Sequence, residues 1–274
     1  MFIDTHCHIH ESGFYPDDRE AVYQRAVEAN VKMICIGTSE KFSAEAVEFA
    51  AAHQNTWATV GVHPHDTKDG WMKIGELLRV EHGRVARGGV APAFADKIGN
   101  DGSGKSKIVG IGEIGLDYFY DNSPRQTQIA ALEQQLQWAS DYGLPVSFHV
   151  RESFDDFWPI FANFPGVKGV LHSFTDSTKN LEKALANNLF IGVNGISTFS
   201  KTNQGMWDQI PLEKMLLETD APFLTPTPFR GKINEPMYVR EVAAYHARKR
   251  GISLDKIAAT TSRNAAQLFH IITG

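Results

Sequence analysis

Short apolar runs rich in β-branched residues alternate with segments of helical periodicity along the chain, and this alternation restricts the possible folds more than any other feature. Eight runs are strand candidates, and they lie at residues 2–5, 31–37, 56–62, 107–112, 144–148, 167–171, 189–193 and 214–219. They are continuously apolar, as parallel strands covered on both faces are. Eight such strands separated by helices in 274 residues predict a (β/α)8 TIM barrel, with an open doubly wound sheet as the alternative.

The helical segments carry recognisable ends. Ser123 is expected as an N-cap, with Pro124 at the first helical position and Gly143 just past the last turn. Two further helices, at residues 235–250 and 254–269, are expected to close the chain. Helical stretches also lie between the other predicted strands, as a barrel requires.

The connection between the third and fourth predicted strands is longer than one helix needs. The excess lies at residues 83–106, which are rich in glycine, alanine and basic residues. We therefore expect a single hydrolase barrel domain spanning residues 1–274, with a loop insertion at residues 83–106 on the barrel rim.

The composition excludes several classes of protein. Lysine and arginine number 27 against 32 acidic residues, so no strong basic field indicates nucleic-acid binding, although metal-mediated contacts stay possible at a net charge of −5. Two cysteines exclude a disulfide scaffold. The N-terminal residues do not resemble a signal peptide, and no run approaches the roughly 18 apolar residues of a membrane span. We expect a cytoplasmic protein without membrane contact.

One motif match does not predict a function. Residues 99–106, GNDGSGKS, fit the Walker A pattern. A phosphate-binding loop of that kind needs a strand before it and a helix after it, so that the helix N-terminus faces the phosphate. Here a predicted strand follows at residues 107–112, and we expect no ATP binding.

Histidines and carboxylates gather at the ends of the predicted strands. His6 and His8 lie two residues apart at the end of the first strand, so their side chains point to the same side. Four more potential ligands each follow a predicted strand directly: Glu113, His149, His172 and Asp220. Because strand ends in a barrel converge on one face, these six side chains predict an active site holding two divalent metal ions, with one carboxylate shared.

Three other residues are candidates for substrate binding. His63 and His65 follow the third predicted strand and could contact a substrate phosphate, or form a rigid turn. Arg151 could bind a phosphate oxygen with two N–H groups, or pair with Glu152 or Asp155.

Seven short segments share the order and residue types of one known family. They are DTHCH (4–8), GVHPH (61–65), GEIGLDY (112–118), HVRE (149–152), LHSFT (171–175), ETDAP (218–222) and NEP (234–236). On these segments, which span nearly the whole chain, the protein resembles the TatD-type metal-dependent deoxyribonucleases of the amidohydrolase-like barrel superfamily. The long connection at residues 83–106 departs from the family pattern, so the family's substrate contacts on that rim do not carry over, whereas every proposed ligand is intact.

The resemblance implies roles for the candidate ligands. His6 and His8 would bind one metal ion, Glu113 would bridge, His149 and His172 would bind the other, and Asp220 would complete the site. It also implies a magnesium-dependent DNase activity, often exonucleolytic, whereas a nitrogen-rich ligand set favours Zn²⁺ or Mn²⁺ over Mg²⁺.

The chemistry expected of this site is hydrolysis of a phosphodiester bond in DNA, most readily single-stranded DNA. Water activated by two metal ions would attack the phosphorus atom, with Asp220 as general base and Glu113 bridging. The alternative enzyme is a binuclear amidohydrolase that cleaves a C–N or ester bond of a small molecule, where a carboxylated lysine often bridges instead of Glu113. A third interpretation is a non-enzymatic scaffold protein. A scaffold would tolerate the loss of metal ligands, and this chain has lost none of them.

Overall fold

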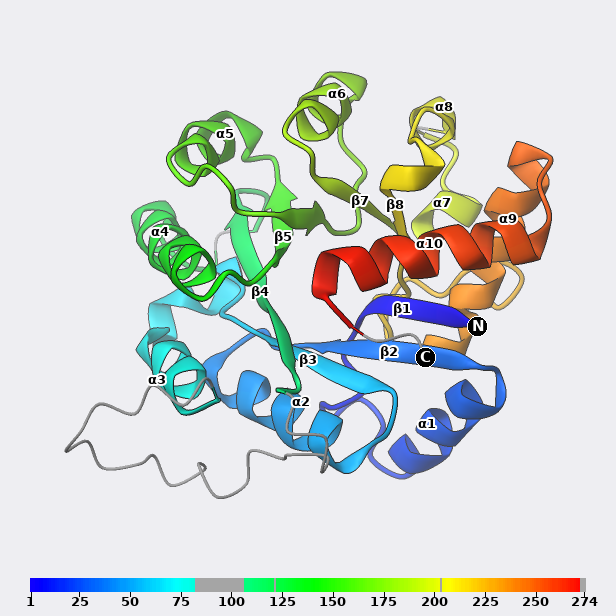
Figure 1. Ribbon diagram of the computed structural model, residues 1–274, viewed down its shortest axis with the longest axis horizontal. Helices are drawn as coiled ribbons and strands as arrows, with labels where there is room; N and C mark the ends of the chain where they lie inside the picture. The colour runs from blue at the N-terminus through cyan, green and yellow to red at the C-terminus, as the bar shows by residue number, and fades with distance from the viewer. Residues whose placement is uncertain (82–105, 121, 203, 272–274) are drawn as a thin grey trace. The chain divides into compact units, whose positions relative to one another are not determined.

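The computed structural model describes residues 1–81, 106–120, 122–202 and 204–271. Within these residues eight strands form one sheet, in which neighbouring strands follow one another in chain order (Figure 1). The strands are β1 (Phe2–Cys7), β2 (Val31–Ile36), β3 (Thr56–Val60), β4 (Ile108–Asp117), β5 (Val146–Arg151), β6 (Gly169–Leu171), β7 (Phe190–Val193) and β8 (Met215–Leu217).

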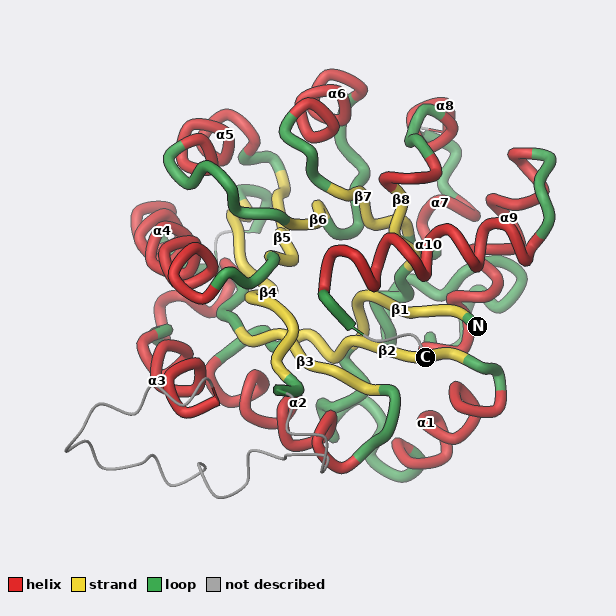
Figure 2. The backbone as a smooth tube through the Cα atoms, viewed as in Figure 1, coloured by secondary structure: helices red, strands yellow, loops and turns green. Residues whose placement is uncertain are grey.

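Helices lie between successive strands and after the last one (Figure 2). The α-helices are α1 (Arg19–Glu28), α2 (Glu40–Ala52), α3 (Met72–Glu81), α4 (Arg125–Tyr142), α5 (Phe154–Ala162), α6 (Thr178–Ala186), α7 (Ile196–Phe199), α8 (Gln204–Asp208), α9 (Val239–Arg250) and α10 (Leu254–Phe269). The 3₁₀ turns among the described residues are η1 (Pro64–Asp69), η3 (Leu212–Lys214) and η4 (Pro236–Tyr238).

The last strand returns to the first. Cys7 and Ala221 form a parallel bridge, and the N–H of Asp220 donates a hydrogen bond of 2.9 Å to the carbonyl oxygen of His6. Strands in chain order, with helices between them and the eighth strand beside the first, confirm the predicted (β/α)8 barrel and exclude the open doubly wound sheet.

The chain divides into two compact units, unit 1 (Met1–Ile34 with Lys168–Gly274) and unit 2 (Cys35–Val167). In unit 1, β7 pairs in parallel with β6 and with β8. Helices α9 and α10 pack against β1 and β8, and α10 runs alongside β1 (Figure 1). Buried apolar side chains on these elements, among them Ile3, Leu216 and Phe269, each stabilise the fold by about 1.5–3 kcal/mol.

In unit 2, β4 is the central strand. It pairs in parallel with β3 and β5, and all ten of its residues are buried. The register places Gly115 opposite His149 and Asp117 opposite Arg151. A Cβ atom on Gly115, whose φ is +152°, would overlap the carbonyl oxygen of His149, so only glycine allows the two strands to approach this closely here.

Aromatic packing fixes α5 against β5. The ring of Phe148 on β5 lies edge-on to those of Phe157 and Phe161 on α5, with centroids 5.2 and 5.6 Å apart. Such pairs add about 0.5–1.5 kcal/mol to the free energy gained by burying the rings. The strand that carries His149 is therefore held rigidly on its helix side.

Local signals explain where several helices begin and end. The hydroxyls of Ser39, Ser177 and Ser253 accept hydrogen bonds from backbone N–H groups in the first turns of α2, α6 and α10. Gly143 and Gly251 end α4 and α9 in the left-handed conformation that glycine adopts most readily. The prediction for Gly143 is confirmed.

Several predicted boundaries are wrong. β1, β4 and β5 continue beyond their predicted ends, so His6, Glu113 and His149 lie within strands. A polar residue ends an apolar run in the sequence without ending the strand, because alternate side chains of a barrel strand point into the barrel, where polar groups are accommodated at its mouth. Ser123 does not cap α4, because its hydroxyl donates to the carbonyl oxygen of His65 and accepts from the N–H of Lys68.

Other predictions are confirmed only in part or lie outside the described residues. The helix expected from residue 235 begins as the 3₁₀ turn η4, with α9 following at Val239, whereas α10 has the predicted bounds. The insertion at residues 83–106 and the Walker-like segment lie outside the described residues except for Ser106. No helix in the described parts of the chain is long and apolar enough to cross a membrane.

Candidate functional site

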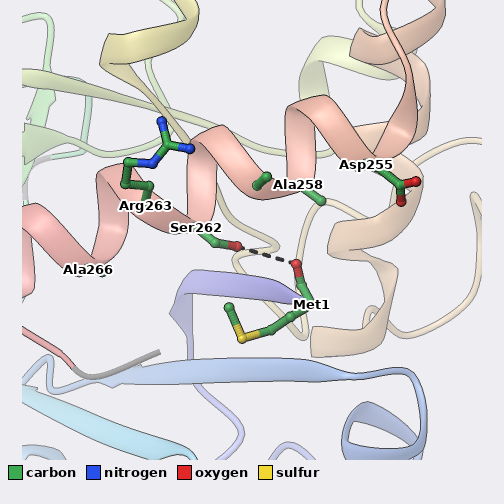
Figure 3. A pocket seen from close by; sticks show the side chains of 7 residues that line it. Met1, Asp255, Ala258, Ser262, Arg263 and Ala266 are labelled. Atoms are coloured by element: carbon green, nitrogen blue, oxygen red, sulfur yellow. Dashed lines mark hydrogen bonds between the residues drawn. The ribbon is translucent and has the colours of Figure 1, made fainter. Parts of the chain in front are cut away.

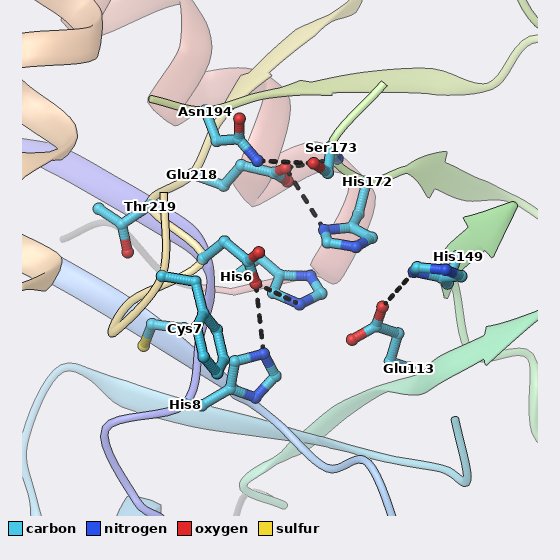
Figure 4. Close-up of polar contacts among 12 residues, drawn as sticks. His6, Cys7, His8, Glu113, His149, His172, Ser173, Asn194, Glu218 and Thr219 are labelled. Atoms are coloured by element: carbon cyan, nitrogen blue, oxygen red, sulfur yellow. Dashed lines mark hydrogen bonds and ion pairs between the residues drawn. The ribbon is translucent and has the colours of Figure 1, made fainter. Parts of the chain in front are cut away.

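In unit 1, two histidines at the end of β1 face one carboxylate that follows β8. The Nε2 atoms of His6 and His8 lie 3.6 and 3.4 Å from Oδ1 of Asp220. The centroids of the two imidazole rings are 5.1 Å apart, and the side chains of His6 within β1 and His8 directly after it point to the same side (Figure 4). Hydrogen bonds between the ends of β1 and β8 bring the three predicted ligands together.

His172 directly follows β6 and lies against His6. The two rings stack with centroids 3.8 Å apart and planes inclined by 15°. Nδ1 of His172 lies 3.5 Å from Oε1 of Glu218, an oxygen that also accepts a hydrogen bond of 2.6 Å from the N–H of Ser173 (Figure 4). Donor atoms of His6, His172 and Glu218 lie within 4.8 Å of one another, so this trio could hold a metal ion.

Asp220 carries its negative charge in these surroundings. Burial alone would raise its pKa, but the hydrogen bond with His8 and the positive charges that His172 and His6 can carry lower the pKa to about 2. At neutral pH the side chain is therefore a carboxylate, and it can act as a metal ligand or a proton acceptor.

A buried acid connects the two chain segments that carry these ligands. Oδ1 of Asp4 accepts hydrogen bonds from the N–H groups of His6 and Thr219, and Oδ2 accepts one of 2.6 Å from the hydroxyl of Thr219. Burial raises the pKa of Asp4 to about 8 against the effect of these bonds. Asp4 thus fixes the backbone at His6 relative to the residue before Asp220.

In unit 2, a second group of possible ligands surrounds Glu113 of β4. Oε1 of Glu113 lies 3.0 Å from Nδ1 of His149 on β5 (Figure 4). The same oxygen lies 3.5 Å from Nε2 of His63, which precedes η1. Donor atoms of the three residues lie within 4.8 Å of one another. Imidazole and carboxylate are ligands that Zn²⁺ and Mn²⁺ accept, so the donor set of this unit 2 cluster fits a divalent cation.

Asp117, the last residue of β4, lies beside the unit 2 cluster. Its Oδ2 contacts Nε2 of His149 at 2.9 Å and Nε2 of His65 at 3.0 Å. Its Oδ1 accepts hydrogen bonds of 2.9 and 3.0 Å from the N–H groups of Phe119 and Tyr120. One carboxylate therefore holds two histidines and the turn after the strand.

The charge of Asp117 determines how these histidines are protonated. Burial alone would raise its pKa, but the hydrogen bonds from His149, His65 and the backbone of Tyr120 outweigh this effect and hold the pKa well below the ordinary value. Because a carboxylate only accepts hydrogen bonds, Nε2 of each histidine carries the proton. Nδ1 of His149 is then the nitrogen that faces Glu113, and a cation bound there would take its lone pair.

Arg151 extends over aromatic rings, and within the described part of the chain it pairs with no acid. Its guanidinium carbon lies 3.9 Å from the ring centroid of Phe119 and 5.0 Å from that of Tyr120. The sequence predicts two alternative roles for Arg151, and the ion pair with Glu152 or Asp155 does not occur among the described residues. The phosphate-binding role stays a prediction.

Sequence reasoning did not single out Asp117 or Glu218. Both lie in segments that carry the family resemblance, GEIGLDY and ETDAP, and each acid ends or directly follows a strand. β4 ends five residues after its predicted end and β8 two residues before its own, so the predicted strand ends point to Glu113 and Asp220 instead. Correct strand ends would have revealed both acids.

Two cavities lie apart from these clusters. A cavity of about 390 Å³ in unit 1 lies between Met1 and the face of α10 that carries Ala258, Ser262 and Arg263 (Figure 3). A cavity of about 590 Å³ in unit 2 is lined by residues of α2, η1 and α3, including Glu40 and Asp66. Among the described residues neither lining contains a histidine, so neither shares the ligands of the clusters.

Comparison with known proteins identifies the family. A family model described as TatD related DNase matches residues 3–270. The chain belongs to the TatD family. The resemblance carried by the seven short segments is thereby confirmed over nearly the whole length of the protein.

Individual TatD relatives match along nearly their whole lengths. The uncharacterized metal-dependent hydrolase YabD of Bacillus subtilis (strain 168) is 31% identical over 275 residues, which cover 99% of this chain and 100% of YabD. The 3′-5′ ssDNA/RNA exonuclease TatD of Erwinia amylovora is 34% identical over 266 residues, covering 93% of this chain and 95% of that protein.

A solved structure extends the comparison to the TatD fold. The crystal structure of YJJV, a TatD homolog from Escherichia coli K12, superposes with a TM-score of 0.82 at 30% identity and covers 99% of this chain and 98% of that one. The TatD barrel is therefore confirmed by both comparison and topology, and the protein is a TatD-family metal-dependent hydrolase with imidazole and carboxylate groups suited to metal ions.

Proposed function

We propose that this TatD-family hydrolase removes nucleotides from single-stranded DNA by metal-dependent hydrolysis of phosphodiester bonds. The observation that carries the proposal is the presence of imidazole–carboxylate groups in both units of a chain that matches the TatD related DNase family. A relative named a 3′-5′ ssDNA/RNA exonuclease supports exonucleolytic cleavage from the 3′ end.

We propose six residues as ligands of two divalent metal ions: His6, His8, Glu113, His149, His172 and Asp220. When bound, the ions would lower the pKa of water and polarise the phosphate. The nitrogen-rich set favours Zn²⁺ or Mn²⁺, and Mg²⁺ remains a candidate because of the family.

The residues of the chain would move the proton and hold the substrate. Oδ1 of Asp220 contacts His6 and His8, so Oδ2 is the atom proposed to accept a proton from the attacking water. Glu113 would keep His149 and His63 aligned. His63, His65 and Arg151 are proposed to bind the substrate phosphate.

The competing function is hydrolysis of a C–N or ester bond in a small molecule, which the name of YabD as a metal-dependent hydrolase leaves open. A substrate screen tests the choice. Purified protein is stripped with EDTA, reloaded with Mg²⁺, Mn²⁺ or Zn²⁺, and offered end-labelled single-stranded DNA, duplex DNA, RNA, and a panel of amides and lactones. A His6→Ala/His8→Ala variant purified in the same way controls for contaminating nucleases.

The proposal predicts shortening of single-stranded DNA from its 3′ end, lost with EDTA and restored by metal. Duplex DNA should be a poorer substrate, and the control variant should be inactive. Hydrolysis of amides or lactones without any shortening of the oligonucleotide would contradict the proposal and favour the small-molecule hydrolase.

A further inference from the structure

Two neighbouring aromatic side chains of unit 2 are exposed to solvent beside the candidate site. Phe119 and Tyr120 follow the end of β4 and are 50% and 45% exposed. Their rings lie edge to face, with centroids 4.7 Å apart. Aromatic rings lose free energy by remaining in contact with water, so an exposed pair at a strand end suggests a ligand that covers it.

The turn that carries these rings is held in place on both sides. The hydroxyl of Tyr118 donates a hydrogen bond of 2.7 Å to Asp156, and the guanidinium of Arg125 lies 4.1 Å from the centroid of the Tyr118 ring. The N–H groups of Phe119 and Tyr120 donate to Asp117, as described above. The two exposed rings therefore project from a turn that is already ordered, which lowers the entropic cost of binding to them.

A guanidinium group lies over the same rings. The register of β4 and β5 sets Arg151 opposite Asp117 and so beside the turn, with its guanidinium carbon 3.9 Å from the Phe119 ring. Among the described residues the Arg151 side chain makes no hydrogen bond or ion pair. Its N–H groups can therefore bind a phosphate while the planar group stays stacked on Phe119.

The aromatic pair adjoins the unit 2 cluster through Asp117. The ring of Tyr120 lies 5.3 Å from that of His65. Nε2 of His65 donates to Oδ2 of Asp117, the oxygen that also accepts from His149. A nucleotide bound on these rings would lie next to the residues proposed to bind the phosphate that is cleaved.

We propose that Phe119, Tyr120 and Arg151 form a nucleobase platform. A base of the single-stranded substrate stacks on the exposed rings, and the Arg151 guanidinium binds an adjacent phosphate. This inference rests on the proposed function. It specifies the feature of the substrate that the site recognises, which is an accessible base face. Bases inside a duplex are covered by their neighbours, so the platform selects single strands without selecting a sequence.

The size and charge of the surface favour a nucleotide over a protein partner. A stable protein interface covers about 800 Å² on each side, whereas the exposed apolar area here comes from two side chains. A ring face next to a cationic group complements a base joined to a phosphate.

Binding to a pair of oligonucleotides tests the platform. One is a short fluorescent oligothymidylate, and the other has the same phosphates but abasic sugars at its 3′-terminal positions, so the two differ in stacking and not in charge. Anisotropy is measured in EDTA, where hydrolysis stops, for the wild type, Phe119→Leu and Phe119→Leu/Tyr120→Leu. Tyr120→Phe keeps the ring, and Met72→Ala removes a 61% exposed apolar side chain elsewhere in unit 2.

The platform predicts that the wild type binds the base-bearing oligomer at least about fivefold more tightly than the abasic one. The double leucine variant should bind both oligomers as the wild type binds the abasic one, whereas Tyr120→Phe and Met72→Ala should keep the preference. A leucine variant that retains the preference, or that loses affinity for both oligomers equally, would overturn the platform.

The same oligomers separate this inference from the proposed function. A wild type that binds and hydrolyses single-stranded DNA with no preference for bases would overturn the platform and leave the proposed function standing. A wild type that neither binds nor hydrolyses either oligomer would overturn both.

Discussion

Nε2 of His149 donates a hydrogen bond of 2.9 Å to Oδ2 of Asp117, and this bond determines which nitrogen of His149 faces Glu113. Nδ1 then lies 3.0 Å from Oε1 of Glu113 and is the nitrogen that would give its lone pair to a bound cation. Residues that hold a ligand histidine in this way orient the ring and increase its basicity. Asp117 therefore prepares His149 for a cation without being one of the predicted ligands.

The first prediction concerns Asp117→Asn. The amide oxygen can still accept from the N–H groups of Phe119 and Tyr120, which leaves the NH₂ group facing His149 and His65. Nε2 of His149 must then become an acceptor, and the proton moves to Nδ1, where it opposes metal binding. We expect metal affinity to fall by roughly 10–100-fold, measured by competition with a chromophoric chelator.

Asp156→Asn is the matched control for Asp117→Asn. Asp156 accepts a hydrogen bond from the hydroxyl of Tyr118, which an amide oxygen can also accept. Its metal affinity should equal that of the wild type. Equal affinities of wild type and Asp117→Asn would show that Asp117 does not orient His149.

The second prediction concerns the close approach of β4 and β5. Gly115→Ala places a methyl group against the carbonyl oxygen of His149 and forces alanine into a φ of +152°. Backbone strain and overlap together should lower the free energy of unfolding by about 3 kcal/mol, measured by urea denaturation. Gly13→Ala, where no atom lies within 4 Å of the added carbon, should change it by less than about 0.5 kcal/mol. Similar values for the two variants would contradict this explanation of Gly115.

The third prediction concerns pH and a buried histidine far from the proposed ligands in sequence. His246 on α9 is 1% exposed, and its Nε2 bonds to the hydroxyl oxygen of Ser197 at 2.8 Å. Burial and the nearby charge of Arg250 lower its pKa from 6.5 to about 3. The native state therefore keeps His246 neutral, while the unfolded chain binds a proton below pH 6.5, so stability is lost as the pH falls from about 6.5 towards 3.

His246→Gln isolates that effect, because the amide can donate to Ser197 and does not titrate. Between about pH 7.5 and pH 5, the wild type should lose about 2 kcal/mol more stability than the variant. Denaturant titrations at both pH values provide the comparison. The same loss in both proteins would mean that His246 is not the group responsible.

The fold could be predicted from the sequence because a barrel needs only the order and length of its apolar runs. The runs at Val31 and Phe190 begin strands within one residue of the prediction. The end of β4 could not be predicted, since Gly112 and Glu113 interrupt an apolar run although both lie inside the strand. Whether such a residue ends a strand or points into the barrel depends on neighbours that are distant in sequence.

Some features of the candidate site could likewise be predicted from the sequence, and others could not. His6, His8 and Asp220 could be proposed as neighbours, because strand ends that belong together in a barrel can be read from the sequence. The environment of Arg151 could not be predicted, because it depends on the β4–β5 register that brings Phe119 beside Arg151. Adjacent acids in the sequence suggested an ion pair, but the strand directs the side chain towards the aromatic turn.

The measurement that tests the central claim most directly compares turnover on single-stranded DNA with metal content for two variants. Asp220→Asn keeps the shape and one coordinating oxygen but removes the basic carboxylate. Glu113→Gln weakens the group that faces His149 and His63. Both variants are assayed beside the wild type at saturating metal, with bound metal determined by elemental analysis.

If the chain is a metal-dependent nuclease with Asp220 as its base, Asp220→Asn should retain metal while turnover falls by roughly 10²–10⁴-fold, and Glu113→Gln should lose both metal and activity. Near-normal turnover by Asp220→Asn at saturating metal would remove Asp220 from the mechanism and contradict the account.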